Sequence, residues 1–521
     1  MVTPQRQRIL WVDDEIDLLR PHILYLEDKG YQVVPVSNGY DALEIAEREE
    51  FDVVLLDEMM PGMGGLAVLE AIKQRRPNLS VVMITKSEEE HLMNEALGRK
   101  ISDYLIKPVN PSQIFLACKK IFEARALERG AAVRTYVEEL GRDRGAPLAR
   151  FAWPDWVEAY LRAARWGLEL EAIEETDLQD AHRAQLGEFN RHFSRFASEH
   201  YADWIASPPN GRPLLSPEVV PARVLPLLQA GRRAALIVID CLRMDQWLVF
   251  EPLLAGDFRV TTEAACSILP TATPYARNAI FGGLYPRELA SEYPDFWREA
   301  QADETGKNRF ERELLARLLA RHGVAEQRIR YAKIASRQDA EEFSRRIGSL
   351  SDCDLVALVF TFVDTFTHGR GRDAILAEFA QDGEALRAHL GTWFERSIVR
   401  DAIREMGRQG RVVIVTTDHG NIQVRRPARV RADRHASAGV RFKFGKALRA
   451  EAEQALLIQE PRRFGLPAGG ILKTYLFAKE DYFLIYPTNQ HAYERLLRDS
   501  FQHGGISLEE MVVPLATLQP S

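Results

Sequence analysis

The sequence predicts an α/β protein of several domains, with a helical segment between two α/β domains. Residues 1–125 alternate short apolar segments with helical patterns five times. Residues 206–521 contain three further apolar segments that each lead into an aspartate, whereas residues 126–205 show helical periodicity and no strand pattern. A chain of 521 residues is also too long for one hydrophobic core, which agrees with three domains.

The composition indicates a globular protein kept in a reducing compartment. Hydrophobic residues make up 46% and charged residues 27%, which is ordinary for globular domains, and the net charge of −7 gives no general attraction to nucleic acid. The four cysteines are scattered without CxxC spacing, which argues against a disulfide framework or a thiolate zinc site. No apolar run reaches about 18 residues, so we expect no signal peptide, no membrane insertion and a cytoplasmic location.

The first domain, residues 1–125, has the pattern of a doubly wound parallel sheet. Its predicted strands are Ile9–Val12, Gln32–Val36, Val53–Leu56, Ser80–Ile84 and Asp103–Ile106. Its predicted helices are Asp17–Asp28, Asp41–Glu50, Leu66–Arg75, Glu88–Leu97 and Ser112–Phe122. Right-handed crossovers assemble such an alternation into one parallel sheet with helices on both faces.

Polar side chains follow several of these strands, at the sheet edge where α/β proteins place ligands. Asp13 and Asp14 follow the first strand, and Asp57 follows the third. Three clustered carboxylates favour a hard cation such as Mg²⁺. Thr85 and Lys107 follow the fourth and fifth strands, where they are placed to bind the oxygens of a phosphoryl group on Asp57.

These residues lie in segments that resemble the receiver domain of bacterial two-component response regulators. The matching segments are Val12–Glu15, Leu56–Gly62, Thr85 and Tyr104–Pro108. The resemblance implies a flavodoxin-like receiver in which Asp57 accepts phosphate from a sensor histidine kinase. It also implies that Asp13, Asp14 and Asp57 bind Mg²⁺. Thr85, Tyr104 and Lys107 would form the switch that responds to phosphorylation.

The middle segment, residues 126–205, predicts a helical bundle that links the two α/β domains. Apolar residues recur at helical spacing over residues 153–164 and 189–204, after a first helix at Ala126–Leu140. Residues 169–180 are acidic, which argues against a DNA-reading helix-turn-helix. Three histidines have no carboxylate partner at a metal-binding spacing, so we interpret them as surface or packing residues: His182, His192 and His200.

The last domain, residues 206–521, repeats the pattern of a buried strand followed by metal-binding side chains. Six candidate ligands follow these strands or lie in a later glycine-rich loop: Asp240, Asp364, His368, Asp418, His419 and His503. Three carboxylates and three imidazoles are enough for two ions with three protein ligands each. Mixed nitrogen and oxygen ligands suit Zn²⁺, with Mn²⁺ as the alternative, and paired ions can stabilise both oxygens of an in-line displacement at phosphorus.

The segment Pro270-Thr271-Ala272-Thr273 opens a predicted helix between the first two strands of this domain. A hydroxyl near a helix N-terminus lies where backbone N–H groups favour an anion. A threonine at this point can attack phosphorus if a metal lowers the pKa of its hydroxyl, and Thr271 and Thr273 offer the same chemistry. Arg277 and Asn278, further along the helix, are candidate contacts for a non-bridging phosphate oxygen.

Together these motifs resemble the alkaline phosphatase superfamily, including the nucleotide pyrophosphatase/phosphodiesterases and the PglZ branch. The matching segments are Val238–Asp240, Pro270–Thr273, Gly283–Pro286, Asp364–His368, Thr417–Gly420 and His503–Gly505. The resemblance implies one zinc ion bound by Asp364, His368 and His503. It implies a second zinc bound by Asp240, Asp418 and His419. The resemblance favours Thr273 as the nucleophile, and Thr271 stays an alternative two residues away.

A basic segment, residues 422–449, contains nine arginines and lysines against one acid, Asp433. Such a segment is typical of a solvated loop. The competing interpretation is a basic lid over a polyanionic substrate such as a phosphodiester or an oligonucleotide. Beyond this segment, Leu472–Phe477 and Tyr482–Tyr486 predict a β-hairpin before the His503 loop.

Over essentially its whole length the chain resembles the PorX-type response regulators associated with type IX secretion. The resemblance implies that phosphorylation of Asp57 promotes a homodimer and that the effector domain is an enzyme. Our first hypothesis is a phosphorylation-controlled, zinc-dependent phosphodiesterase acting on nucleotide or oligonucleotide substrates. The alternative is a signalling scaffold whose zinc domain turns over little or nothing and recruits a secretion component or a sigma factor.

Overall fold

The structure is a computed structural model that divides into two compact units, residues 1–141 and 142–521. It describes residues 7–76, 78–86, 101–173, 176–208, 211–297, 308–324, 329–350, 352–369, 383–433, 436–437, 439–468, 473–486 and 490–521. The predicted helix at Glu88–Leu97 lies outside these residues. Within the described ranges, no helix combines the length and the apolar character needed to cross a membrane.

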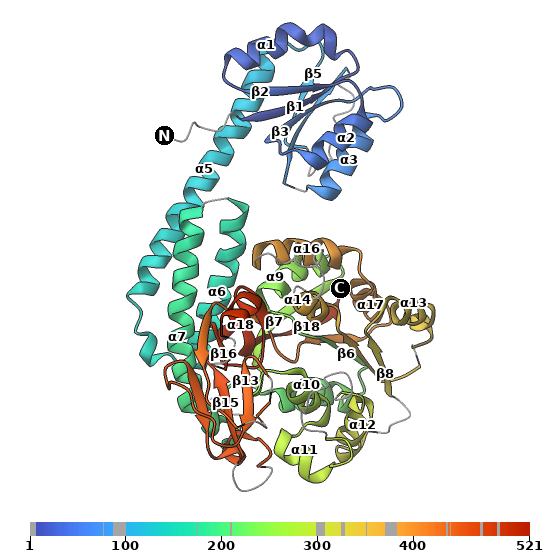
Figure 1. Ribbon diagram of the computed structural model, residues 1–521. Helices are drawn as coiled ribbons and strands as arrows, with labels where there is room; N and C mark the ends of the chain where they lie inside the picture. The colour runs from blue at the N-terminus through green and yellow to red at the C-terminus, as the bar shows by residue number, and fades with distance from the viewer. Residues whose placement is uncertain are drawn as a thin grey trace. The chain divides into compact units, whose positions relative to one another are not determined.

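The first unit is a five-stranded parallel sheet in the order β2-β1-β3-β4-β5, which confirms the flavodoxin-like prediction (Figure 1). The strands are β1 (Arg8–Val12), β2 (Gln32–Val36), β3 (Val53–Asp57), β4 (Ser80–Thr85) and β5 (Asp103–Ile106). One face packs against α1 (Arg20–Asp28) and the start of α5 (Pro111–Arg144), and the other against α2 (Gly39–Arg48) and α3 (Gly65–Arg75).

The prediction of two separate helices at Ser112–Phe122 and Ala126–Leu140 is wrong, because α5 runs without a break from Pro111 to Arg144. The residues between the two predicted helices include no proline. Gly130 costs a helix only about 1 kcal/mol relative to alanine, which does not interrupt it.

The second unit begins with two long helices, α6 (Trp153–Ala172) and α7 (Thr176–Ala206). Trp156 of α6 is fully buried and packs edge-on against Phe189 and Phe193 of α7. The same hydrophobic cluster continues into the following α/β domain through residues such as Trp247 and Leu269. The predicted linker helices therefore share one core with the domain that follows them.

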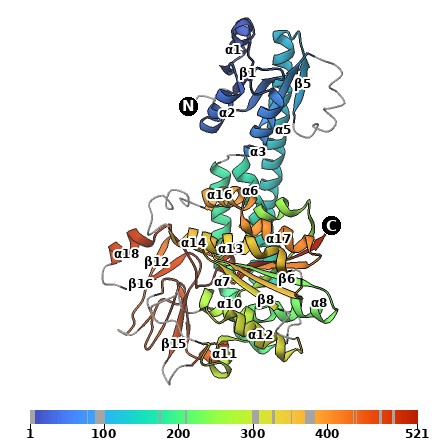
Figure 2. The same ribbon diagram turned by 90° about the vertical axis from the view of Figure 1, so that its right-hand side faces the viewer.

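The central sheet of the second unit has six strands in the order β7-β18-β10-β6-β9-β8. Figure 2 labels two of them, β6 and β8. The six strands are β6 (Ala234–Ile239), β7 (Phe258–Cys266), β8 (Ile329–Ile334), β9 (Leu355–Phe360), β10 (Val412–Thr416) and β18 (Val512–Pro520). β8, β9, β6 and β10 run parallel, whereas β18 is antiparallel to both of its neighbours. The parallel strands β6, β9 and β10 are buried along their whole length, as their apolar runs predict.

Helices cover both faces of this sheet. One face packs against α9 (Met244–Phe250), α16 (Gly383–Glu395) and α17 (Ile398–Arg408). The opposite face packs mainly against α10 (Thr273–Gly282) and α12 (Glu311–Arg321). Because the parallel strands all end at one edge, the segments that follow β6, β9 and β10 meet there.

The predicted β-hairpin at Leu472–Phe477 and Tyr482–Tyr486 is wrong in its pairing, although both strands form. β15 (Thr474–Ala478) pairs with β13 (Phe442–Gly445) and β14 (Ala455–Ile458), whereas β16 (Tyr482–Ile485) pairs in parallel with β12 (Arg426–Arg429). The basic segment supplies β12 and β13, whose backbone hydrogen-bonding groups take the places that a hairpin partner would occupy.

Candidate metal centre and phosphorylation site

The first unit collects three carboxylates at the carboxyl edge of its sheet. Ligand atoms of Asp13, Asp14 and Asp57 lie within 4.8 Å of one another. Lys107 Nζ lies 3.0 Å from Asp13 Oδ2 and 2.8 Å from Asp57 Oδ1. Burial raises the pKa of Asp57 above its ordinary value, while its hydrogen bond with Lys107 acts in the opposite direction. The arrangement can hold a hard divalent cation and keeps an ammonium group beside Asp57.

The two other predicted switch residues lie on the neighbouring strands. Thr85 ends β4 and is buried, and its backbone carbonyl accepts a hydrogen bond from the Lys107 N–H at 2.7 Å. Tyr104, on β5, is aligned with Met83 on β4 and is half-buried against the α2 and α3 face. The predicted residues of this site therefore come from adjacent strand ends, apart from Tyr104, which lies near the start of β5.

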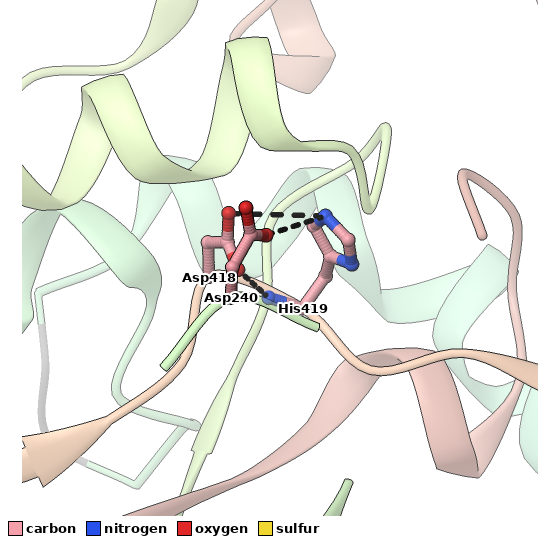
Figure 3. Close-up of side chains that lie close together, drawn as sticks. All are labelled: Asp240, Asp418 and His419. Atoms are coloured by element: carbon pink, nitrogen blue, oxygen red, sulfur yellow. Dashed lines mark hydrogen bonds and ion pairs between the residues drawn. The ribbon is translucent and has the colours of Figure 1, made fainter. Parts of the chain in front are cut away.

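The second unit brings Asp240, Asp418 and His419 together at the ends of the neighbouring strands β6 and β10 (Figure 3). His419 Nε2 lies 4.0 Å from Asp240 Oδ1 and 3.8 Å from Asp418 Oδ2. His419 Nδ1 lies 3.0 Å from the Gly420 carbonyl, so a proton on Nδ1 leaves the Nε2 lone pair directed into the cluster. Asp418 Oδ2 is buried and has no hydrogen-bond partner among the described residues, which fits a metal ligand.

Burial dominates the electrostatics of this cluster. It raises the pKa of Asp240 well above its ordinary value and raises that of Asp418, and it lowers the pKa of His419. In each case low solvation penalises the charged form of the side chain. A bound cation would compensate the two carboxylates, and one nitrogen with two oxygens is a ligand set that suits zinc.

Arg277, which the sequence suggested as a contact for a phosphate oxygen, instead binds two buried carboxylates. Its Nη1 donates to Asp240 Oδ2 at 2.5 Å and lies 3.7 Å from Asp418 Oδ2, while its Nε donates to Glu311 Oε1 at 2.5 Å. Arg277 and Glu311 are both fully buried. Asn278 donates to the Pro274 carbonyl and accepts from Asn308. Arg277 therefore neutralises the carboxylates of the cluster from α10.

Thr273 and Thr271 have separate surroundings. Thr273 is the first residue of α10 and is partly exposed, and its Oγ1 lies 3.0 Å from His419 Nε2 and 3.4 Å from Asp240 Oδ1. Thr271 is fully buried. Its hydroxyl donates to the Gly505 carbonyl at 2.9 Å and accepts from the Gly504 N–H at 3.0 Å. Only Thr273 of the two directs its hydroxyl into the cluster.

A second group of predicted ligands adjoins this cluster. His503 Nε2 lies 3.9 Å from Asp364 Oδ1, and the His503 ring stacks on the His419 ring with centroids 4.1 Å apart. Asp364 lies in α14 (Phe362–Gly369), directly after β9. The side chain of His368 lies outside the described residues. Five of the six predicted ligands thus form a continuous set of neighbours, in which Asp240 and His419 lie beside Thr273.

The basic segment divides between surface and core. Arg425, Arg429 and Arg431 are exposed, as the solvated-loop and lid interpretations both require. Arg441, in contrast, is fully buried in an ion pair with Glu510, and Glu510 also accepts the Gly505 N–H at 2.8 Å. The sequence did not reveal this pair, which supports the loop that contains His503.

Two of the three linker histidines, His182 and His200, take the packing and surface roles expected of them. His182 is buried, and burial lowers its pKa to about 4. The His200 ring lies against the Phe196 ring with centroids 4.7 Å apart, and its Nδ1 lies 2.9 Å from the Phe196 carbonyl.

Three protein families match successive parts of the chain. The family described as "BREX system PglZ alkaline phosphatase-like domain" matches residues 219–518. The "Response regulator receiver domain" family matches residues 9–119, and the "PorX response regulator linker domain" family matches residues 144–205. The three matches follow the order that the sequence predicted.

Individual relatives each match part of the chain. The alginate biosynthesis transcriptional regulatory protein AlgB of Pseudomonas aeruginosa is 36% identical over 126 residues, which is 24% of this chain and 28% of that protein. The alkaline phosphatase synthesis transcriptional regulatory protein PhoP of Bacillus subtilis is 29% identical over 170 residues, covering 32% of this chain and 69% of that protein. A CheY-like receiver structure from Methanospirillum hungatei JF-1 is 30% identical, with a TM-score of 0.22, and the match covers 24% of this chain and 99% of that one.

Proposed function

Because the chain belongs to the PorX-type response regulators and has a PglZ alkaline phosphatase-like effector domain, we propose that it is a zinc-dependent phosphodiesterase controlled by phosphorylation of Asp57. The observation that carries this proposal is the position of the Thr273 hydroxyl, 3.0 Å from His419 Nε2 and 3.4 Å from Asp240 Oδ1. A nucleophile at a helix N-terminus beside a cluster of metal-binding side chains is the arrangement that phosphoryl transfer requires.

Two groups of side chains would hold the metal ions. Asp240, Asp418 and His419 form one group, and Asp364, His368 and His503 form the other. Bound zinc would lower the pKa of the Thr273 hydroxyl and offset negative charge on the phosphoryl oxygens. Mn²⁺ suits the same nitrogen and oxygen ligands, so metal analysis of the purified protein decides between the two.

Thr273 performs the covalent step. Its hydroxyl oxygen forms a bond to phosphorus and loses its proton to solvent, while the bond from phosphorus to the leaving-group oxygen breaks. The leaving group takes a proton from water, and phosphorus stays bonded to Thr273 and to the second ester oxygen of the substrate. Water then attacks this phosphorus and the bond to Thr273 breaks, which releases a phosphomonoester and restores the hydroxyl. The positive end of the α10 dipole favours the anionic phosphoryl group throughout.

Nucleotide or oligonucleotide phosphodiesters are the substrates that the surface charge supports. Arg425, Arg429 and Arg431 of the basic segment are exposed, and arginine binds phosphate oxygens through a planar fork of N–H donors. Binding that depends on such contacts weakens as salt concentration rises.

Hydrolysis of bis-p-nitrophenyl phosphate and of short cyclic oligonucleotides tests the proposed activity. We expect wild-type protein to contain about two zinc equivalents, as two three-ligand groups require. His503→Ala should lose metal and most of its activity. The exposed His491 provides the control, since His491→Ala should change neither quantity. Undiminished hydrolysis in His503→Ala would exclude the two-zinc mechanism.

Phosphorylation of Asp57 by a histidine kinase is the proposed control on this activity, in the regulation of type IX secretion. We expect beryllofluoride with Mg²⁺ to shift the protein from monomer to dimer in analytical ultracentrifugation. Asp57→Asn should stay monomeric, whereas Asp28→Asn, which changes an exposed carboxylate, should behave like wild type. A wild-type protein that stays monomeric under these conditions contradicts phosphorylation-promoted dimerisation.

One observation favours the alternative, a scaffold that recruits a secretion component or a sigma factor. Arg277 already places a cation 2.5 Å from Asp240, so the cluster is partly neutralised without metal. This alternative expects much less than two metal equivalents per chain, little or no hydrolysis, and phosphorylation-dependent binding of a protein partner.

A further inference from the structure

Beyond the buried His182 near its start, helix α7 buries Asn190, Ser194 and Tyr201 on an otherwise aromatic face. Asn190, Ser194 and Tyr201 are 4%, 1% and 0% exposed, respectively, although they lie in a helix at the surface of a bundle. Their spacing of four and seven residues places them on one stripe of the helix. Buried polar groups are costly unless they form hydrogen bonds, so the partners of these side chains show what the stripe contacts.

Asn190 and Ser194 bind the segment that follows His503. The Asn190 side-chain oxygen accepts from the Leu508 N–H at 2.8 Å, and its nitrogen donates to the Glu509 carboxylate at 2.9 Å. Ser194 Oγ donates to the Ile506 carbonyl at 3.0 Å. Three bonds from one helix therefore fix residues 506–509, directly after the His503 loop.

The same segment lies against the residue that follows His419. A Cβ atom at Gly420 would lie only 1.9 Å from the Glu509 carbonyl oxygen, so the two backbones touch. The Gly420 N–H donates to the Glu510 carbonyl at 3.1 Å. Glu509 therefore contacts both Asn190 and Gly420, the residue that follows His419.

Tyr201 binds the segment that leads to the proposed nucleophile. Its hydroxyl oxygen accepts from the Leu269 N–H at 2.7 Å, and the ring stacks on Phe464 with centroids 5.7 Å apart. Leu269 lies four residues before Thr273. Because the hydroxyl and the Leu269 N–H are both buried, neither has water as a substitute partner.

We infer that Asn190, Ser194 and Tyr201 are positioning residues that fix the His503, His419 and Thr273 segments to the linker helix α7. The inference rests on the proposed function for its catalytic meaning. A displacement of α7 would leave the buried Leu508 and Leu269 N–H groups without hydrogen-bond partners. The segments that contain these two residues should therefore move together with the helix. The linker is then part of the scaffold of the metal centre, and a shift of α7 is a route by which a signal alters the geometry around Thr273.

Hydrogen exchange in the full-length, metal-free protein tests this inference without requiring activity. We expect Tyr201→Phe to speed exchange in peptides covering 267–271, and Asn190→Ala in peptides covering 506–510, by roughly tenfold or more, since each removes a buried hydrogen bond. Glu188→Ala, an exposed change on the same helix, should leave both peptides unchanged. Tyr201→Phe removes only one oxygen atom, so it keeps the test valid if Asn190→Ala fails to fold.

Kinetics and metal affinity separate positioning from general stability. Positioning predicts that Tyr201→Phe lowers kcat on bis-p-nitrophenyl phosphate with KM unchanged, and that Asn190→Ala weakens zinc binding. A purely structural role predicts a lower unfolding temperature with kcat and zinc affinity unchanged, which would overturn the inference. Unchanged exchange in both variants would overturn it too, even if wild-type protein hydrolyses the substrate. If exchange is faster in the variants but the wild-type protein hydrolyses no substrate, the proposed activity is refuted. The attachment of the two segments to α7 would still hold.

Discussion

Thr273→Val is expected to lower hydrolysis of bis-p-nitrophenyl phosphate by roughly 10⁴-fold or more, because loss of the nucleophile of a hydrolase costs up to about 10⁶-fold. The valine keeps the shape of the side chain and removes the hydroxyl that lies beside His419 and Asp240. Zinc content should stay close to that of wild type, since the ligands are intact. Steady-state kinetics and metal analysis on the same preparations check both expectations.

Thr271→Val is the matched comparison, because it removes the same atom two residues away. Thr271 bonds Gly504 and Gly505, so its loss should lower the free energy of unfolding by about 1–3 kcal/mol and reduce activity far less than Thr273→Val. Thr273→Ser, which retains a hydroxyl, should recover much of the activity. The reverse order of the two valine variants would assign the nucleophile to Thr271.

The predicted site residues that the structure brings together have a common physical origin. Each lies directly after a short apolar strand or at the start of a helix, so a local pattern locates it at the shared carboxyl edge of a parallel sheet. Asp13 and Asp57 in the first unit, and Asp240 and Asp418 in the second, follow this rule. Their chemical identity then indicates which ligand the edge can bind.

Features that depend on contacts between distant segments were not predictable in this way. β15 and β16 pair with β13 and β12, two strands that the basic segment contributes from earlier in the chain. The Arg441–Glu510 ion pair likewise joins residues that are 69 positions apart. Asn190 and Tyr201 lie among aromatic residues that were interpreted only as a packing face. A polar residue recurring at helical spacing on such a face is the one sequence signal that indicates a buried hydrogen-bonding stripe.

Arg277→Met is expected to destabilise the metal-free protein by about 3–5 kcal/mol, since it leaves the buried Asp240 without its guanidinium partner and the buried Glu311, among the described residues, with only the cation of Lys333, whose Nζ lies 4.0 Å away. Methionine fills a similar volume, so the loss reports mainly on charge. Zinc should recover much of this stability, because the ion would neutralise Asp240 in place of the guanidinium. The zinc-induced rise in unfolding temperature should therefore be larger for Arg277→Met than for wild type.

Glu311→Gln distinguishes the contributions of the two buried carboxylates, Asp240 and Glu311, to this loss of stability. When it is combined with Arg277→Met, it removes the charge of Glu311, which is not one of the proposed zinc ligands. The double variant should therefore be more stable than Arg277→Met even without metal. Arg317→Met, on the exposed side of α12, controls for loss of a positive charge in general. If zinc raises the unfolding temperature of Arg277→Met no more than that of wild type, the guanidinium and the metal do not share Asp240. Arg277 would then be a permanent counter-charge beside the metal centre. Its contact with Asp240 would no longer support the alternative of a scaffold that binds little metal.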